Sequence, residues 1–302
     1  MSRLIIPILN STASLLPGPS HYLDNETRID KLNDAEFGLV SKTPAEYAGR
    51  FRTEHRCIFI DFVAGADLES AVSQTATRLR FVLNNFMSHH PLLLEFAVYI
   101  ERSGIKNQYG KPRLVNLGED PSTLLKSETP FKVHAGTKRE DMSQFYALVG
   151  EACAKYKRLY LTLSRFNSAL TRAKLQDKII DATISLESMV QDDKNELSFK
   201  FALYNAFAAT KDPAKRMENF ELLKKLYNTR SSIVHGANDE AKELAMVTNL
   251  STSWKHVEDI TRRAINEFVF FTRDHDPKTW TKHLLEQIVV PPTILPIANA
   301  EK

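Results

Sequence analysis

An arginine and a histidine that could act together on a phosphate stand five positions apart, at Arg230 and His235. A guanidinium offers a planar fork of donors that fits two phosphate oxygens at once. An imidazole exchanges protons near neutral pH and can serve as a general acid or base. These residue types make the stretch 230–235 the leading candidate for chemistry in the sequence, because it offers a cation that can bind an anion and a group that can transfer protons.

The residues around this pair indicate a helix over 213–235, because apolar side chains recur at spacings of three and four. One predicted face consists of Phe220, Leu223, Tyr227, Arg230 and Val234. Arg230 would then lie inside an apolar stripe, where a guanidinium is costly unless it is paired. A buried carboxylate, a partner subunit or a bound phosphate could each compensate its charge.

His235 is followed by Gly236, a residue that is common just after the end of a helix. A histidine in the last turn lies near the negative end of the helix dipole, where a cation is favoured. On an ideal helix, positions 230 and 235 are about 140° apart and do not share a face. The two side chains therefore converge only if the helix tightens or ends near His235, or if the site is built across a dimer.

Glu187 is the acidic residue best placed to pair with Arg230. The apolar pattern predicts a helix over 172–191 whose buried face holds Leu175, Ile179, Ala182, Leu186 and Met189. Glu187 borders this face, and Asp181 is the second choice. Purely structural roles also stay open: an ion pair of Arg230 that fixes helix packing, and a helix-end His235 bonded to local carbonyls.

Three segments together resemble the Apea-like HEPN domain family, whose ribonucleases carry an Arg-x4-His motif. The segments are the acidic helix with Arg172, Asp177, Asp181 and Glu187, the stretch 196–201, and the stretch 225–236. The resemblance covers about residues 165–273, roughly a third of the chain. Residues 1–138 resemble no family that their sequence identifies.

The resemblance implies a helical bundle that forms a homodimer through the motif helices and cleaves RNA. It implies attack by the ribose 2′-hydroxyl on the adjacent phosphate, without a metal ion or a cofactor. His235 would transfer protons, Arg230 would hold the phosphate oxygens, and Glu187 would orient Arg230. Ser231 fills the polar position of the motif, where Asn, Asp or His are commoner in the family.

The resemblance also implies a role in bacterial defence against phages, in which RNA cleavage arrests the infected cell. Lys224 and Lys225 precede Arg230 by one to two turns and could guide the RNA substrate. Asp181 and Tyr227 are candidates for supporting contacts. The N-terminal region could act as a sensor or regulator that binds a phage-derived trigger. The alternative is a non-catalytic HEPN module that binds RNA or a nucleotide, or only dimerises.

The helices that carry these residues belong to one of three regions that the sequence pattern predicts. The regions are a mixed α/β domain at 1–138, a helical HEPN domain at 139–288, and an irregular tail with prolines at 289–302. The expected fold class is therefore α+β, although residues 10–50 give no clear element. We expect strands at 4–9, 57–63, 92–100 and 113–117, and helices at 67–88, 140–168, 172–191, 196–210, 213–235, 239–273 and 278–288.

The composition is typical of a soluble globular protein, with 302 residues, 43% of them apolar and 25% charged. The formal net charge of +3 is too small to argue for nucleic-acid binding by itself, so any RNA contact needs a local patch. Cys57 and Cys153 predict two reduced thiols. No targeting signal or membrane-spanning run is recognisable, which predicts a cytoplasmic protein without membrane contact.

Overall fold

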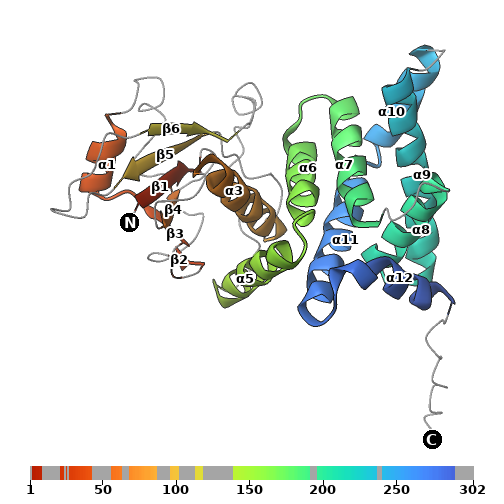
Figure 1. Ribbon diagram of the computed structural model, residues 1–302. Coiled ribbons are helices and arrows are strands. Elements are labelled where there is room, and N and C mark those ends of the chain that lie inside the picture. Colours follow the sequence, from red (N-terminus) through yellow and green to blue (C-terminus); the bar gives the residue numbers. More distant parts are fainter. Residues whose placement is uncertain are drawn as a thin grey trace, which may run out of the picture. The chain divides into compact units, whose positions relative to one another are not determined.

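The structure is a computed structural model that describes residues 2–8, 21–23, 25, 27–42, 56–62, 68–86, 96–101, 113–117, 139–190, 196–236 and 240–289. Contacts between residues divide the chain into two units, Met1–Ser185 and Leu186–Lys302, and each is described by itself. An antiparallel sheet lies in the first unit, and the second unit is helical (Figure 1). The predicted α+β class with a helical bundle is confirmed.

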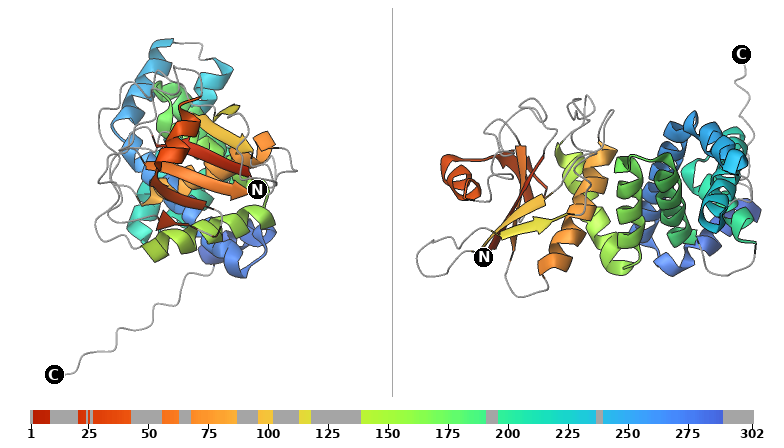
Figure 2. Two further views of the ribbon diagram at one scale, coloured as in Figure 1. Left: turned by 90° about the vertical axis from the view of Figure 1, so that its left-hand side faces the viewer. Right: turned by 90° about the horizontal axis from the view of Figure 1, so that it is seen from above.

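The first unit contains a six-stranded sheet in the order β2-β3-β4-β1-β5-β6, and its neighbouring strands pair antiparallel (Figure 2). The strands are β1 (Ser2–Pro7), β2 (His21–Tyr22), β3 (Thr27–Lys31), β4 (Arg56–Phe62), β5 (Phe96–Glu101) and β6 (Arg113–Asn116). The predicted strands correspond to β1, β4, β5 and β6. The missed elements are β2, β3 and helix α1 (Asp34–Val40), which lie within residues 10–50.

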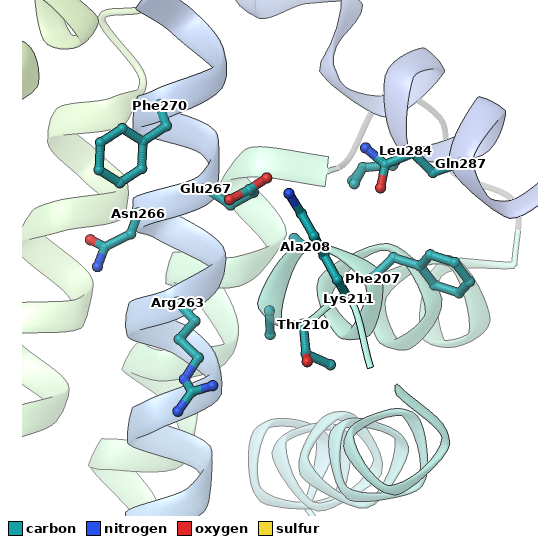
Figure 3. A pocket seen from close by; sticks show the side chains of 11 residues that line it. Phe207, Ala208, Thr210, Lys211, Arg263, Asn266, Glu267, Phe270, Leu284 and Gln287 are labelled. Atoms are coloured by element: carbon teal, nitrogen blue, oxygen red, sulfur yellow. The ribbon is translucent and has the colours of Figure 1, made fainter. Parts of the chain in front are cut away.

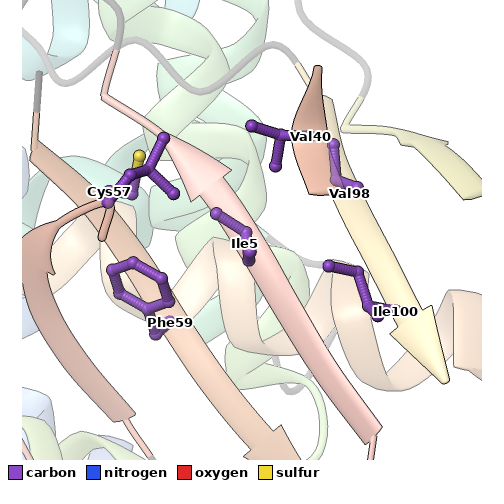
Figure 4. Packing of buried hydrophobic residues seen from close by; sticks show 7 residues of the cluster. Ile5, Val40, Cys57, Phe59, Val98 and Ile100 are labelled. Carbon is purple, nitrogen blue, oxygen red and sulfur yellow. The ribbon is translucent and has the colours of Figure 1, made fainter. Parts of the chain in front are cut away.

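One face of this sheet has its own buried core (Figure 4). Ile5 of β1 is in register with Phe59 of β4 and with Val98 of β5. Because successive side chains of a strand point to opposite faces, these three residues share one face. The same cluster contains Leu32, Val40, Cys57 and Ile100, so the end of α1 packs against the sheet there.

Helix α3 (Leu68–Asn85) is the packing partner of two further helices of the first unit. Both α5 (Arg139–Lys155) and α6 (Leu159–Thr171) pack on α3, where the Phe81 ring lies 6.1 Å from the rings of Phe145 and Phe166. The prediction of one continuous helix over 140–168 is wrong. The chain turns at residues 156–158, because two separate helices contact the same side of α3.

Helix α7 (Leu175–Val190) buries four residues of the predicted face, Ile179, Ala182, Leu186 and Met189, whereas the fifth, Leu175, is half-buried at the start of the helix. It is held to α6 by the Ser185 hydroxyl, which donates to the Thr162 carbonyl at 2.8 Å. The contact division falls inside this helix, between Ser185 and Leu186, whereas the sequence pattern predicts a boundary near residue 138. The difference arises because α5 and α6 pack on α3 of the sheet-containing unit.

The second unit is a bundle built around α8 (Leu197–Ala209), which packs against α9 (Pro213–His235), α11 (Trp254–Asp274) and α12 (Trp280–Val289). Helix α10 (Glu240–Ser251) packs on α9. A single helix over 239–273 is a wrong prediction, because a turn at residues 252–253 separates α10 from α11. Of the predicted tail, residues 290–302 lie outside the described residues.

Both cysteines are buried and free, as the sequence predicts. Burial raises the pKa of the Cys57 thiol, and it raises the pKa of Cys153 to about 12. Both thiols are therefore protonated and unreactive near neutral pH. Among the helices that the structure describes, none combines the length and apolar character needed to cross a membrane.

Candidate functional site

Helix α9 carries the Arg-x4-His pair, and its ends are set by local chemistry. The Asp212 carboxylate accepts a hydrogen bond from the Ala214 amide at 3.0 Å, and Pro213 occupies the first helical position. At the other end, Gly236 has φ of 72°, a conformation that side-chain-bearing residues rarely adopt. The predicted bounds 213–235 are confirmed, and His235 is the last residue of the helix.

The buried face of α9 differs from the predicted stripe. The buried residues are Asn219, Leu222, Leu223, Leu226 and Thr229, whereas Val234 is 48% exposed. Helix α8 packs along α9, and the face that α9 buries is rotated from the predicted one. Arg230 consequently lies at the border of the buried face and is half-buried, so its placement in the middle of an apolar stripe is corrected.

Arg230 lies near Glu187 and Tyr227, and the three form an electrostatic cluster within the second unit. Burial raises the pKa of the Glu187 carboxyl, and the positive charge of Arg230 acts in the opposite direction. Burial and the charge of Glu187 also raise the pKa of Tyr227, again against the effect of Arg230. The structure thus brings together three residues that the sequence singled out.

Glu187 and Tyr227 do not satisfy all the hydrogen-bond donors of the Arg230 guanidinium. Its Nε atom is buried and has no hydrogen-bond partner among the described residues. The charge of Arg230 acts on the pKa of Glu187, so the two side chains lie near each other. No ion pair joins Glu187 to Arg230 within the described part of the chain. A half-buried guanidinium without an ion-paired carboxylate favours the binding of another anion, because its desolvation is otherwise uncompensated.

His235 is exposed and Ser231 is half-buried on the last turns of α9. The helix stays α-helical through His235, so positions 230 and 235 remain about 140° apart around its axis. Among the described residues, no hydrogen bond joins Arg230 to His235. One chain therefore presents the two groups on different faces, and the helix end does not bring them together.

Aromatic side chains accompany the same cluster along α8 and α9. The Phe199 ring, on a residue that is 50% exposed, lies 5.6 Å from the ring of Phe220. The Lys224 ammonium lies 5.5 Å from the Phe220 ring, and Tyr227 packs 5.2 Å from Phe201. We call Phe199, Phe220, Lys224 and Tyr227 the aromatic strip.

Sequence reasoning missed the two phenylalanines of α8 in this setting. Phe199 and Phe201 belong to the stretch 196–201 that contributes to the family resemblance, but their spacing alone does not show which ring meets α9. Lys225, the second predicted RNA-guiding residue, is exposed, and no interaction with the aromatic strip is found for it among the described residues.

Asp181 does not pair with Arg230. Its carboxylate is buried in the first unit and accepts hydrogen bonds from Arg165 at 2.9 Å and from Arg172 at 3.1 Å. The second-choice role predicted for Asp181 is thus replaced by a different one, because two arginines of its own unit occupy both of its oxygens.

A pocket of about 320 Å³ lies elsewhere in the second unit, between the end of α8, α11 and α12 (Figure 3). Lys211, in the link between α8 and α9, extends towards Glu267 of α11, and Phe270 of the same helix also lines the pocket. None of the residues predicted to act on RNA lines this pocket. Within the described ranges, no three His, Cys, Asp or Glu side chains gather as a metal site would require.

The described residues therefore bring Glu187, Tyr227 and Arg230 together, leave His235 exposed at a helix end, and place Asp181 elsewhere. Comparisons with protein-family models, with curated proteins and with solved structures found no match to this chain.

Proposed function

We propose that this protein is a metal-independent endoribonuclease of the HEPN type, with Arg230 and His235 at its active site. One observation carries the proposal: the half-buried guanidinium of Arg230 has no ion-paired carboxylate among the described residues, on a helix that ends in an exposed histidine. Cleavage of RNA by its own 2′-hydroxyl requires a cation that stabilises the phosphate and a group that transfers protons. The guanidinium of Arg230 and the exposed imidazole of His235 can supply these on one helix.

The proposed reaction uses the RNA's own 2′-hydroxyl. Its oxygen forms a bond to the adjacent phosphorus, its proton passes to a general base, and the bond from phosphorus to the 5′-oxygen breaks. The 5′-oxygen then takes a proton, and the products are a 2′,3′-cyclic phosphate and a 5′-hydroxyl. His235 transfers a proton, and Arg230 stabilises the negative charge that grows on the phosphate oxygens.

Two copies of the chain complete the site in this proposal. Because Arg230 and His235 lie about 140° apart on α9, one helix cannot place both on the same phosphate. A twofold symmetric dimer brings each residue of one copy to the surface of the other, so that the Arg230 of one faces the His235 of its partner. The exposed Val234 beside His235 fits such an interface.

Glu187 and the aromatic strip support the same assignment. A half-buried carboxyl with a raised pKa beside an arginine is typical of functional sites. The Glu187 carboxyl interacts electrostatically with Arg230 but forms no ion pair with it, so the guanidinium can still bind a phosphate. The rings of Phe199 and Phe220 offer π-faces on which unpaired bases can stack, and Lys224 adds a positive charge.

A growth experiment tests the proposal in cells. Expression of the wild-type chain in bacteria should slow growth and degrade RNA, as a defence effector would, whereas His235→Ala should relieve both effects at equal protein level. Equal growth for the two proteins, with intact RNA in each, would favour the alternative of a non-catalytic RNA-binding or dimerising HEPN module. Co-purification with phage proteins would test the N-terminal region as a sensor.

A further inference from the structure

Two arginines share one buried carboxylate in the first unit. The Asp181 side chain is only 4% exposed, and its two oxygens accept from Arg165 Nη1 at 2.9 Å and from Arg172 Nε at 3.1 Å. The arginine side chains themselves are 41% and 49% exposed. The three residues, here called the arginine pair site, combine a buried centre with an accessible rim.

The arginine pair site has more positive charge than its carboxylate can neutralise. One guanidinium already balances the charge of Asp181, so the second leaves an excess of one positive charge. Each guanidinium has five N–H donors and gives a single nitrogen to Asp181. Within the described residues no other acceptor binds the guanidinium of Arg165 or Arg172, and their exposure leaves the remaining side-chain donors accessible to a ligand.

The surrounding fold holds both guanidiniums in place before a ligand arrives. Arg165 lies on α6, and Arg172 is the residue that caps the end of α6, where its amide donates to the Ser168 carbonyl. Asp181, one and a half turns into α7, binds both side chains. Arginines fixed in this way lose little further conformational freedom on binding, which favours affinity for an anion.

The chemistry of the free donors selects the ligand. Arginine forks pair bidentately with carboxylates and phosphates. Asp181 occupies Nε of Arg172, so the pair of terminal nitrogens of that guanidinium is still available for two oxygens of one group. Lys174, which is exposed in the link between α6 and α7, adds positive charge, whereas Asp177 on the first turn of α7 opposes it.

We propose that the arginine pair site, whose residues differ from those that perform cleavage, binds a backbone phosphate of RNA. That the phosphate belongs to RNA rests on the proposed function, and the recognition of phosphate rests on the geometry alone. A contact of this kind positions a strand without reading its sequence. It supplies the local patch of positive charge that the small net charge of the chain otherwise lacks.

The test measures binding, so that it does not depend on cleavage. A short 2′-O-methyl RNA oligonucleotide, which has no 2′-hydroxyl to react, is titrated with full-length protein in fluorescence anisotropy at several salt concentrations. The double variant Arg165→Lys/Arg172→Lys keeps the charge but loses the forks, and should bind about tenfold more weakly. The matched control is Arg263→Lys, an exposed arginine of α11 paired with the exposed Asp259 at 3.0 Å, which should bind like wild type.

A second variant guards against misfolding. Arg165→Gln/Arg172→Gln/Asp181→Asn removes the buried charge together with its partners, and its fold is checked by circular dichroism. It should bind about tenfold more weakly, and the slope of log affinity against log salt should fall by about 0.7 for the lost phosphate contact. Unchanged binding in both variants, or no binding by wild type, overturns the proposal and leaves a purely structural ion triad.

Inorganic phosphate distinguishes a backbone phosphate from a free anion. If phosphate raises the melting temperature of the wild type but not of the triple variant, while RNA affinity is the same in both, the assignment to RNA is overturned. The failure of the nuclease proposal looks different: weakened binding in the variants with no cleavage of ordinary RNA by wild type supports this site and rejects the catalytic role of Arg230 and His235.

Discussion

His235 is the exposed last residue of α9, and the proposed proton transfer depends on it. His235→Ala should lower the cleavage rate by about 10²- to 10⁴-fold, because it removes a general acid or base. Affinity for the 2′-O-methyl oligonucleotide should be nearly unchanged. Initial rates on a fluorescent single-stranded RNA measure the effect.

The matched control for this change is His275→Ala. His275 is likewise exposed at the end of a long helix of the second unit, where its ring stacks on Phe271. It should keep wild-type cleavage rates. An equal loss of activity in both variants would show that His235 has no specific role.

The raised pKa of Glu187 has a consequence for stability as well as for the site. Since burial raises the folded-state pKa above that of the unfolded chain, the two states hold the proton equally in acid, and ionisation opposes folding as the pH rises. Glu187→Gln removes this effect. The free energy of unfolding of the variant should therefore rise relative to that of the wild type as the pH increases from acid to alkaline.

Urea titrations over a series of pH values measure this difference. Glu286→Gln on α12, an exposed position, is the control and should show no such pH dependence. If the advantage of Glu187→Gln were constant, or grew towards acid pH, burial would not be the dominant influence on the Glu187 carboxyl.

At the residue scale, the sequence predicted the proximity of Glu187 to Arg230, because Glu187 borders an apolar helix face and Arg230, placed within another, needs a partner. It could not predict that Asp181 belongs to Arg165 and Arg172, since that pairing depends on how α6 meets α7 in space. The aromatic strip was equally hidden, because ring contacts between α8 and α9 follow from packing and not from periodicity.

Helix α9 ends at His235, and the backbone conformation of the next residue, Gly236, terminates the helix there. With φ of 72° and ψ of 120°, an added side chain is strained although no atom lies within 4 Å of its Cβ position. Gly236→Ala should destabilise the protein by about 1–3 kcal/mol and lower cleavage by displacing His235. Chemical denaturation and RNA cleavage assays together measure this.

Gly38 in α1 gives the contrast for this prediction. It lies inside a helix and also has open space at its Cβ position, but without a positive φ. Gly38→Ala should therefore be neutral or stabilising by about 0.5–1 kcal/mol. Similar effects of the two substitutions would contradict the role assigned to the Gly236 backbone.

At the element scale, helices with strong local signals were predictable. Asp212 and Pro213 begin α9 and Gly236 ends it, so its bounds could be read from the sequence. The breaks at residues 156–158 and 252–253 lack glycine and proline, and they follow from packing of separate helices. The short strands β2 and β3 depend on strand pairing, β2 with β3 and β3 with β4, more than on their own composition.

At the scale of the whole molecule, the proposed site requires two copies of the chain. Arg230→Ala and His235→Ala should each be inactive alone. Mixing them with subunit exchange should restore about one quarter of wild-type activity, since half of the dimers are mixed and each contains one intact composite site. No restoration by mixed dimers, verified by differently tagged subunits, would place both groups within one chain.

The position of the division between the two units could not be predicted from the sequence. The sequence marks a change of composition near residue 138, but α5 and α6 join the sheet-containing unit through α3. The division therefore falls inside α7, where no local signal marks it. The phosphate contact proposed for Arg165 and Arg172 lies in the first unit, and the Arg230 cluster lies in the second.

The chemical ends of the cleaved RNA test the central claim most directly. Purified wild-type protein is incubated with a single-stranded RNA in excess EDTA, and the products are identified by mass spectrometry. The proposed mechanism predicts 2′,3′-cyclic phosphate and 5′-hydroxyl ends, absent with His235→Ala. Loss of cleavage in EDTA, or products with 3′-hydroxyl and 5′-phosphate ends, would contradict it.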